Sequence, residues 1–439
     1  MPLNILITAF GSAGDVLPLI GVGAELRKRG HEVTLVSNPH FEPRAAEAGM
    51  AFSPVGSVAG YHELMNDAGL FDWRTAGDRV LALFAHIVEP VYETVMRLHQ
   101  PGRTVILTGA QGSWIAQEKC YIPVAQIVVA PSRLPSRHDP PHPPRPLVPW
   151  AARLAKSRRG IRFLYGLRLG LDRLSAAGRS KAPSAPAANP FLDEMNRVRA
   201  RLELPLFDAS SALQFPPERI VCMWPDWFAE RQSDWPPEAM VAGFPFYPEP
   251  PPTGEGAPGR PDGGADRNLL VFTTGSVASR QEAFFASAVE ACRILQRPGI
   301  LVTPHGDQLP RPLPTRVTHL THAPFGELFA RAALVVHHGG IGTMALALAA
   351  GIPQVVRPMM GEQFDLGNRL QRLGVGRMID DRFAAPGPLA KVIDALLRSE
   401  RVAKRCRHWQ ARIDRLGLTH AADAVDSLAA SSRLPLAAG

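Results

Sequence analysis

The sequence predicts an α/β protein with two doubly wound parallel sheets, for three reasons. In both halves of the chain, short apolar runs that fit buried strands alternate with segments of helical periodicity. A stretch rich in proline and glycine, residues 244–267, separates the halves and fits an interdomain linker. The chain of 439 residues is also long enough for two buried cores.

The first half starts with an apolar run of the buried-strand type, residues 4–10, which ends in a glycine-rich loop at residues 11–15. A helix is expected from that loop to Arg29, because its apolar residues share one face and Gly30 fits the C-cap. Further strands are expected at residues 32–37, 51–55, 104–108 and 124–128, with a helix at 41–48. These elements belong to a predicted N-terminal domain, residues 1–243.

The second half restarts the pattern with a strand at residues 269–274. Residues 332–356 carry no formal charge, and their length alone would allow a membrane span. Two histidines, several glycines and Pro353 instead favour a buried strand, turn, helix and strand. The predicted C-terminal domain covers residues 268–418, and a last helix within residues 419–439 is expected to return to the N-terminal domain.

Composition and cysteine spacing fit an ordinary globular protein. The net charge of +8 is modest for this length, and 46% of the residues are hydrophobic. The four cysteines lie far apart without a C-x-x-C pair, so we expect them to be reduced and structural. Residues 3–9 lack the basic segment and cleavage site of a secretory signal, so we expect a cytoplasmic protein.

Residues 150–173 form a basic segment, with seven arginines and lysines against one acid, Asp172. Apolar side chains are interleaved with these charges. Two interpretations stay open. The segment either makes a peripheral contact with the anionic inner face of a membrane or covers a lipid pocket, or it is a solvated basic helix pair that folds over the N-terminal domain.

The most informative stretch follows the apolar strand at residues 334–336. His337 and His338 are followed by three glycines and Thr343. Imidazole, bare backbone amides and a hydroxyl are therefore expected in the loop between a strand and the helix that follows it. Such a junction suits a phosphate or diphosphate. Glu362 and Gln363 then follow the next strand, residues 354–356, and can hold hydroxyl groups. Together they predict a cradle for a nucleotide-diphosphate sugar.

These motifs resemble a known family. Residues 11–18, Gly-Ser-Ala-Gly-Asp-Val-Leu-Pro, and residues 338–343, His-Gly-Gly-Ile-Gly-Thr, are similar to signatures of the inverting nucleotide-sugar glycosyltransferases, in their bacterial and sterol-glucosylating branch. The resemblance implies the GT-B architecture, in which two Rossmann-like domains face a central cleft. Within the branch, residues 11–18, 243–245, 340–354 and 363–365 look closest to the rhamnosyltransferases of rhamnolipid synthesis.

The resemblance implies a role for each site residue. Asp15 would be the catalytic base, in an acceptor-side loop with Gly11 and Ser12. The donor residues would be Ser276, His338, Gly340, Gly342 and Thr343 for the diphosphate, His322 and Phe325 for the nucleobase, and Glu362 and Gln363 for the sugar.

Each of these residues also allows a plainer role. Asp15 suits the N-cap of a helix that begins near Pro18. The plainer role of His338 is that of an ordinary core histidine. Glu362 and Gln363 would be unremarkable residues at a helix N-terminus. His337 is expected to have a packing role at the strand end.

The resemblance implies transfer of L-rhamnose from dTDP-L-rhamnose to the hydroxyl of a 3-(3-hydroxyalkanoyloxy)alkanoate lipid, with a possible partner enzyme that supplies this lipid. Residues 322–325, His-Ala-Pro-Phe, stand where plant relatives carry W-x-P-Q, so a dTDP donor fits at least as well as UDP. The chain has no D-x-D motif, so we expect no catalytic metal, and no cofactor besides the sugar donor.

Two alternatives stay open. One is a UDP- or dTDP-hexose glycosyltransferase acting on a sterol, polyketide or other natural product. The other is a non-catalytic partner subunit that binds the nucleotide sugar. A nicotinamide oxidoreductase is disfavoured, because the G-x-G-x-x-G spacing is absent and the second strand ends at Ser37 without an acid.

Overall fold

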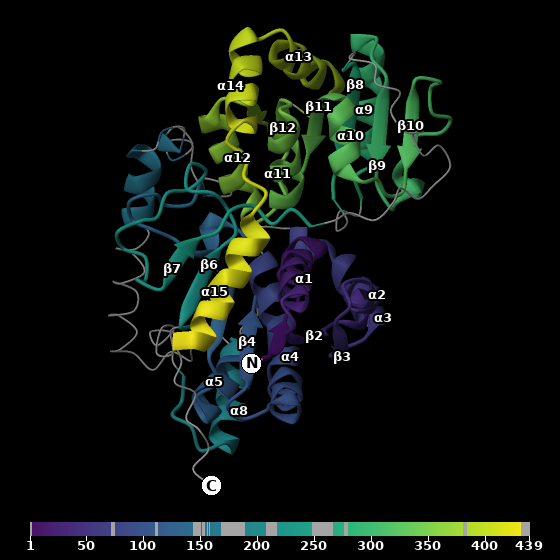
Figure 1. The fold of residues 1–439 in the computed structure, drawn as a ribbon. Helices are drawn as coiled ribbons and strands as arrows, with labels where there is room; N and C mark the ends of the chain where they lie inside the picture. Colours follow the sequence, from purple (N-terminus) through teal and green to yellow (C-terminus); the bar gives the residue numbers. More distant parts are fainter. Residues whose placement is uncertain are drawn as a thin grey trace. The chain divides into compact units, whose positions relative to one another are not determined.

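In a computed structural model, the chain folds into two compact units, each built on one parallel sheet (Figure 1). The first unit comprises Met1–Pro245 and Leu416–Gly439, and the second comprises Phe246–Arg415. The structure describes residues 2–71, 75–109, 113–143, 151, 154–155, 157, 159–167, 189–207, 217–247, 267–275, 280–380 and 384–431. Most of the predicted linker, residues 248–266, therefore lies outside the described residues.

The first unit holds a seven-stranded sheet in the order β3-β2-β1-β4-β5-β6-β7. Its strands are β1 (Asn4–Thr8), β2 (Glu32–Ser37), β3 (Ala51–Pro54), β4 (Thr104–Thr108), β5 (Val124–Val128), β6 (Arg219–Cys222) and β7 (Ala239–Val241). All pairs are parallel, and Thr8 of β1 lies opposite Thr108 of β4. The strand order reverses between β1 and β4, and open sheets of this type bind ligands at the carboxyl ends of such strands.

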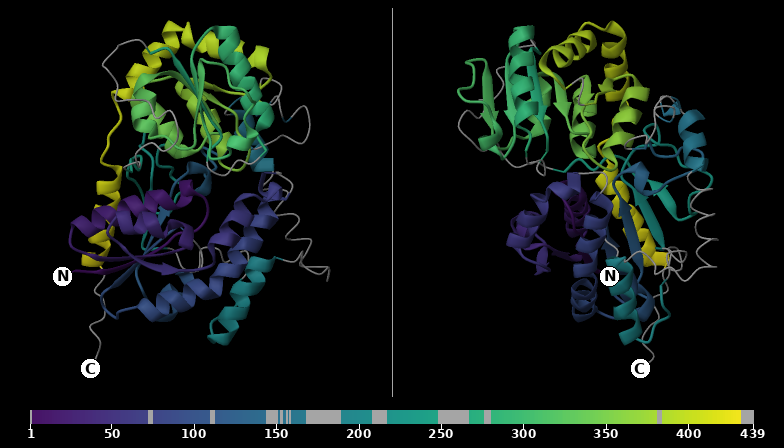
Figure 2. Two further views of the ribbon diagram at one scale, coloured as in Figure 1. Left: turned by 90° about the vertical axis from the view of Figure 1, so that its right-hand side faces the viewer. Right: turned by 180° about the vertical axis from the view of Figure 1, so that it is seen from behind.

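Helices cover both faces of this sheet (Figure 2). They are α1 (Ala13–Lys28), α2 (Glu42–Glu47), α3 (Val58–Met65), α4 (Ala76–Leu98), α5 (Trp114–Cys120), α8 (Pro190–Arg201) and α15 (Gly417–Ser431), with short 3₁₀ turns η1 (Pro39–Phe41), η2 (Ala68–Phe71) and η4 (Pro131–Arg133). Val91 of α4 and Val198 of α8 pack on Leu6 and Ile106 of the strands. On the other face, α1 approaches so closely that a Cβ on Gly23 would lie 2.6 Å from Cδ1 of Ile7.

The C-terminal helix α15 belongs to the first unit and packs on α1 (Figure 1). Arg29, at the end of α1, donates at 2.7 Å to both Asp423 and Asp426. Nε2 of His31 also lies 2.7 Å from a carboxylate oxygen of Asp426. These contacts fix the last helix on the first sheet although it follows the whole second unit in the sequence.

The helix after the first strand begins before Pro18, which the N-cap alternative for Asp15 had placed near its start. Helix α1 begins at Ala13, with Ser12 as its N-cap, and Pro18 lies inside it. Asp15 is therefore the third helical residue and not the N-cap. Proline so near a helix start costs one hydrogen bond, to the carbonyl of Gly14.

The second unit holds a six-stranded parallel sheet in the order β10-β9-β8-β11-β12-β13. Its strands are β8 (Leu269–Thr273), β9 (Gly299–Val302), β10 (Val317–Leu320), β11 (Ala332–His337), β12 (Gln354–Val356) and β13 (Gly376–Met378). The helices are α9 (Glu282–Leu295), α10 (Phe325–Arg331), α11 (Ile341–Ala350), α12 (Gln363–Leu373), α13 (Pro386–Leu397) and α14 (Glu400–Gln410), with the short turn η5 (Gly306–Gln308).

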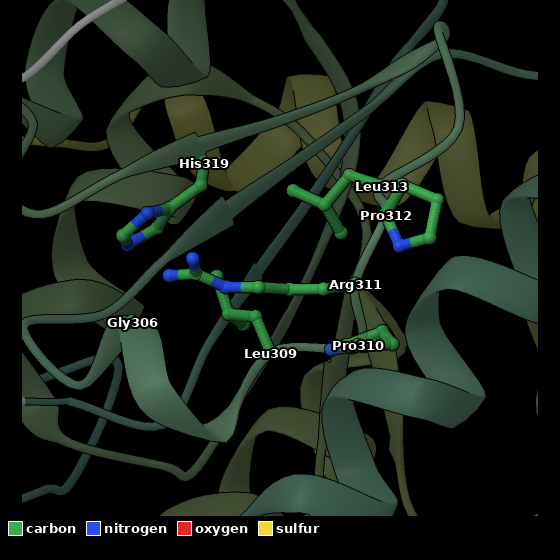
Figure 3. A pocket seen from close by; sticks show the side chains of 7 residues that line it. All are labelled: Gly306, Leu309, Pro310, Arg311, Pro312, Leu313 and His319. Carbon is green, nitrogen blue, oxygen red and sulfur yellow. The ribbon is translucent and has the colours of Figure 1, made fainter.

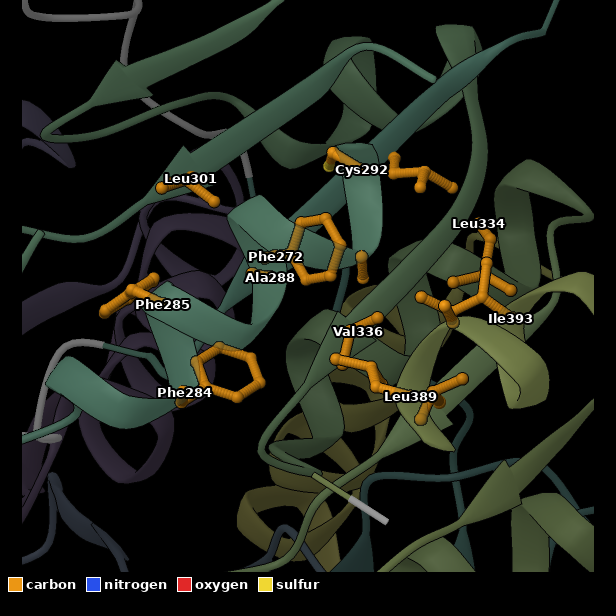
Figure 4. Close-up of a cluster of buried hydrophobic side chains, with 14 of the residues drawn as sticks. Phe272, Phe284, Phe285, Ala288, Cys292, Leu301, Leu334, Val336, Leu389 and Ile393 are labelled. Atoms are coloured by element: carbon orange, nitrogen blue, oxygen red, sulfur yellow. The ribbon is translucent and has the colours of Figure 1, made fainter. Parts of the chain in front are cut away.

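Alternate residues of the central strands pack on opposite faces of this sheet. Leu270 and Phe272 of β8 face the cluster built by α9 and α13, which is shown in Figure 4. Val271, between them, belongs to a second cluster that includes Phe329 of α10 and Ala347 of α11. Both faces of the sheet are therefore covered, which explains why the central strands are continuous runs of apolar residues.

The uncharged stretch 332–356 forms β11, α11 and β12, as predicted, with a fully buried strand at its start. No helix among the described residues is long and apolar enough to cross a membrane. The four cysteines are free thiols, and three of them are buried. Much of the basic segment, including residues 150, 152, 153, 156, 158 and 168–173, lies outside the described residues.

Candidate functional site

The predicted diphosphate loop joins β11 to α11. Gly340 is the N-cap of α11, and its carbonyl accepts the first intrahelical bond, from the amide of Met344 at 3.0 Å. The amides of Ile341, Gly342 and Thr343 precede that bond, and no side chain of the described residues caps them. An uncapped helix N-terminus offers N–H donors and the positive end of the helix dipole, which together favour an anion.

The imidazole of His338 lies between two glycines. A Cβ on Gly275 would lie 2.6 Å from its Cε1 atom, and one on Gly340 would lie 2.6 Å from its Nε2 atom. Both positions therefore require glycine. Nδ1 is buried without a hydrogen-bond partner among the described residues. Burial lowers the pKa of His338 to about 4, so the ring is neutral at pH 7 and carries one N–H donor.

His337 is completely buried and fully hydrogen-bonded. Its Nδ1 accepts from the amide of Gly339 at 3.2 Å, and its Nε2 lies 3.0 Å from the side-chain oxygen of Gln354. Burial, with a smaller effect of His338, lowers the pKa of His337 to about 3. His337 therefore has no nitrogen available for a ligand, in agreement with the packing role expected of it.

The predicted sugar-binding pair lies beside the same loop. A Cβ on Gly339 would lie 3.2 Å from Cβ of Gln363, so the two predicted segments touch. The side-chain oxygen of Gln363 accepts from the amides of Met359 and Met360 at 2.8 and 3.2 Å. Gln363 thus turns only its amide nitrogen, a donor, to a ligand. Glu362 occupies the N-cap position of α12.

The predicted nucleobase residues lie between β10 and α10. Phe325 starts α10, and its ring stacks on Phe329 with centroids 5.0 Å apart and an interplanar angle of 14°. One of its faces is therefore used for internal packing. His322 is half-buried in the preceding loop. Ser276, predicted to bind the diphosphate, lies outside the described residues, although its neighbour Gly275 borders His338.

Sequence reasoning missed Arg357, directly after β12. Its amide donates to the carbonyl of His337 at 2.9 Å, and its guanidinium donates to the side chain of Gln281 at 2.7 Å. The guanidinium also lies 5.7 Å from the ring centre of Phe284. This cation is held against the start of α9, on the side of the unit that carries the diphosphate loop. No local motif marks it, because its partners come from distant parts of the sequence.

An open pocket of about 600 Å³ lies at the edge strand β10 of the second unit. Leu309, Pro310, Pro312 and Leu313 give it an apolar lining, and the Arg311 side chain points toward His319 (Figure 3). Its lining includes none of the predicted site residues, so it is distinct from the diphosphate loop.

In the first unit, the carboxylate of Asp15 is held by three donors. One oxygen accepts from the amide and the hydroxyl of Ser12, at 3.0 and 2.9 Å. The other accepts from the guanidinium of Arg133 at 2.6 Å. Gly11 makes room for this arrangement, because it has a φ of +121° and a Cβ on it would lie 2.7 Å from the carboxylate.

Arg133 and the aromatic neighbours of Asp15 were also missed. Tyr61 is buried, and that burial, with the nearby charge of Asp15, raises its pKa to about 12. His40 stacks on Tyr61 with ring centroids 4.1 Å apart. Arg133 follows β5, Tyr61 follows β3 and His40 follows β2, so the parallel sheet brings them together at its carboxyl edge, next to Asp15. The sequence could not reveal this grouping, because it depends on long-range contacts between strands.

Two family models match the chain. The Glycosyltransferase family 28 N-terminal domain matches residues 5–97, which include Asp15. The erythromycin biosynthesis protein CIII-like C-terminal domain matches residues 300–411, which include the segment from His337 to Gln363.

Two curated relatives are similar over most of this chain. The O-mycaminosyltylonolide 6-deoxyallosyltransferase of Streptomyces fradiae is 28% identical over 444 residues, covering 96% of this chain and 94% of that protein. The sterol 3-beta-glucosyltransferase of Emericella nidulans is 27% identical over 402 residues, covering 85% of this chain. The chain spans only 26% of the length of that fungal protein.

Solved structures share the fold. The glycosyltransferase of kitacinnamycin aligns with a TM-score of 0.69 and 20% identity, over 98% of this chain and 99% of that one. The spinosyn rhamnosyltransferase SpnG has a TM-score of 0.62 and 18% identity, over 97% and 99%. The glycosyltransferase VinC, solved in complex with dTDP, has a TM-score of 0.62 and 17% identity, over 98% and 100%.

The two parallel-sheet units and these neighbours show that the chain has the GT-B fold, which it shares with the neighbouring glycosyltransferases. The two family models each match one part of this fold, residues 5–97 in the first unit and residues 300–411 in the second.

Proposed function

We propose that the chain transfers a sugar from a nucleotide-diphosphate donor to a hydroxyl group of a sterol, polyketide or related natural product. The observation that carries the proposal is the cradle at the start of α11. There the imidazole of His338 lies beside Gly340, at an uncapped helix N-terminus, and its buried Nδ1 has no partner among the described residues. Such a cradle suits a diphosphate leaving group, because its donors are already in place and need no metal to be arranged.

In the proposed reaction, Asp15 takes the proton of the acceptor hydroxyl as the oxygen attacks the anomeric carbon. The bond from that carbon to the diphosphate breaks, and the leaving electron pair stays on the diphosphate, which the amides of residues 341–343 and the N–H of His338 stabilise. A single displacement of this kind inverts the anomeric configuration. Gln363 donates to a sugar hydroxyl through its amide nitrogen, and Glu362 accepts from another.

The acceptor class rests on the relatives. By name, they act on a sterol and on O-mycaminosyltylonolide. The narrower prediction, transfer of rhamnose to a 3-(3-hydroxyalkanoyloxy)alkanoate, has no specific support among the relatives, and SpnG shares only the fold. We retain dTDP as the proposed donor nucleotide, because residues 322–325 lack the W-x-P-Q pattern of plant relatives and because a dTDP complex is found among the structural neighbours.

The first experiment measures thermal stabilisation of the intact chain by dTDP, UDP, GDP and NAD at matched concentrations, because a bound ligand raises the apparent stability. We expect the largest shift with dTDP. Stabilisation by NAD alone would contradict the proposal. The preferred nucleotide is then supplied as its glucose, rhamnose and deoxysugar forms with three acceptors: a sterol, a macrolide aglycone and a hydroxyalkanoyl lipid.

The acceptor assay separates the remaining alternatives. Product formed with the sterol or the macrolide supports the proposal, and product formed only with the lipid and dTDP-L-rhamnose would restore the narrower prediction. Stabilisation by dTDP without product from any acceptor would identify a non-catalytic partner subunit. In any product, the anomeric configuration read by NMR tests whether the displacement is single.

We also propose a peripheral contact with anionic membranes through the helical residues 159–167. Phe163 and Leu167 lie one turn apart and are 59% and 44% exposed, and Arg159 is exposed beside them. An exposed apolar pair next to a cation suits the membrane interface. Flotation with vesicles containing phosphatidylserine tests it: replacing both apolar residues with serine should reduce binding. Equal flotation of the variant would favour the solvated-helix interpretation.

A further inference from the structure

We infer that His337 is a positioning residue for the diphosphate loop, which it holds in its binding conformation through the amide of Gly339. The inference rests on the proposed function of that loop. His337 itself contacts no ligand in this scheme, because both of its ring nitrogens are already used inside the protein.

The hydrogen bonds around His337 have one consistent direction. Nδ1 accepts from the amide of Gly339, so the ring proton must lie on Nε2. Nε2 then donates to the side-chain oxygen of Gln354, and the amide nitrogen of Gln354 donates to the carbonyl of Met344 at 3.3 Å. The chain of bonds thus runs from the loop through β11 and β12 to helix α11.

The same bonds fix the backbone where the loop turns. Gly339 has a φ of +100°, a conformation that side-chain-bearing residues rarely adopt. A Cβ there would lie 2.9 Å from Val356 and would also meet Gln363, so the turn is packed on two sides. Because the carbonyl of His337 also accepts from the amide of Arg357, the peptide groups on both sides of His338 are anchored. The position of the His338 ring follows from this anchored turn.

Burial makes this anchor independent of pH in the neutral range. The ring of His337 has no exposed surface, and its pKa lies near 3, so it keeps its Nε2 proton and its accepting Nδ1 above that pH. No carboxylate is among its hydrogen-bond partners in the described part of the chain, and the titratable side chain that faces it is His338. His337 therefore stays neutral in the neutral pH range, and its Nδ1 keeps accepting from the amide of Gly339.

Two isosteric variants test the inference. Asparagine keeps an acceptor near the position of Nδ1, whereas glutamine keeps a polar group near Nε2 and loses the bond to Gly339. We expect His337→Gln to weaken dTDP binding about tenfold and His337→Asn to weaken it less than about threefold. Acceptor KM should stay unchanged in both. Val336→Ala is the matched control, because Val336 is equally buried in β11; it should lower the melting temperature without changing dTDP affinity.

Equal loss of dTDP affinity in the two His337 variants, or a loss that merely follows the melting temperature as in Val336→Ala, would overturn the inference. A measurement on the unmodified chain covers the case in which the variants do not fold. In ¹⁵N NMR spectra, His337 should show the Nε2–H tautomer from pH 5 to 8, with and without dTDP. A change of its protonation on adding dTDP would also overturn the inference. If the unmodified chain does not bind dTDP at all, the proposed function fails, whereas the tautomer still reports on His337.

Discussion

The two loops on which the proposed function rests differ in how far the protein itself satisfies their polar groups. In the first unit, the carboxylate of Asp15 receives hydrogen bonds from Ser12 and an ion pair from Arg133. In the second unit, Nδ1 of His338 is buried without a partner among the described residues, and no described side chain caps the amides that start α11. In the proposed function the diphosphate loop thus keeps its donors for a ligand, whereas the protein itself fills three of the about four acceptor positions of Asp15.

The largest effect is expected from Asp15→Asn, which keeps the shape of the carboxylate but removes its basicity. If Asp15 is the base, the rate at saturating substrates should fall by roughly 10²- to 10⁴-fold, because general-base catalysis contributes about that much. The affinity for dTDP, measured by calorimetry, should not change. Full turnover by Asp15→Asn would remove the proposed base and leave Asp15 as the residue that closes the capping box with Ser12.

The next effect concerns His338. His338→Leu removes the N–H donor and should weaken dTDP binding by about 10- to 100-fold, since a hydrogen bond to a charged group contributes about 1.5–3 kcal/mol. Its control is His319→Leu in β10 of the same unit, where the imidazole bonds the carbonyl of Thr303. The two variants should differ clearly in dTDP affinity by calorimetry. Equal affinities would mean that His338 is only a core histidine.

The glycines around His338 offer a steric test of the same loop. Gly340→Ala places a Cβ 2.6 Å from Nε2 of His338, whereas a Cβ on Gly342 meets nothing within 4 Å. Moving the imidazole should reduce dTDP affinity about tenfold in Gly340→Ala, because overpacking costs about 1–3 kcal/mol. Gly342→Ala should bind dTDP nearly as the unmodified chain does, unless the ligand itself lies against that Cα.

His337 and His338 should also make the stability of the protein depend on pH. Their pKa values in the folded state, about 3 and 4, lie below the ordinary value of 6.5. Between about pH 6.5 and pH 4 the unfolded chain binds protons that the folded chain does not, so stability decreases as the pH falls. Each histidine contributes a slope of up to about 1.4 kcal/mol per pH unit.

Denaturant unfolding at pH 7, 6 and 5 measures this slope, with His338→Gln as the comparison. Glutamine does not titrate, so the variant should lose stability less steeply than the unmodified chain as the pH falls. Identical slopes would show that His338 is exposed enough to be protonated in the folded state.

The smallest effect is expected at Arg133. Its ion pair with Asp15 is partly exposed, with 42% and 22% of the two side chains accessible, and such pairs contribute about 0–1 kcal/mol. Arg133→Gln frees an oxygen of Asp15 and should raise the turnover rate by no more than about fivefold. Arg137→Gln, on an exposed residue of the same loop, is the control. A decrease of more than about tenfold in Arg133→Gln alone would instead place Arg133 in contact with a substrate.

Much of the fold follows from local patterns in the sequence. The strands β2, β4 and β5 lie where the apolar runs predicted them, because a buried parallel strand needs a short uninterrupted run of apolar side chains. The short strands β6, β7 and β13 were not predicted. The helix after the first loop starts at Ala13, where Ser12 is the N-cap and its amide donates to the carboxylate of Asp15.

The sequence by itself determined the candidate loops, since glycine, histidine and helix-starting residues at fixed spacing are local features. It also pointed to His338 and Asp15 as the groups with chemistry to perform. Only the tertiary structure decided what surrounds them. The bond from His337 to Gln354, the contact of Arg133 with Asp15 and the packing of Gly275 on His338 join residues from separate strands or from the loops that follow them. Such contacts depend on strand order and register, which side-chain periodicity along one segment does not encode.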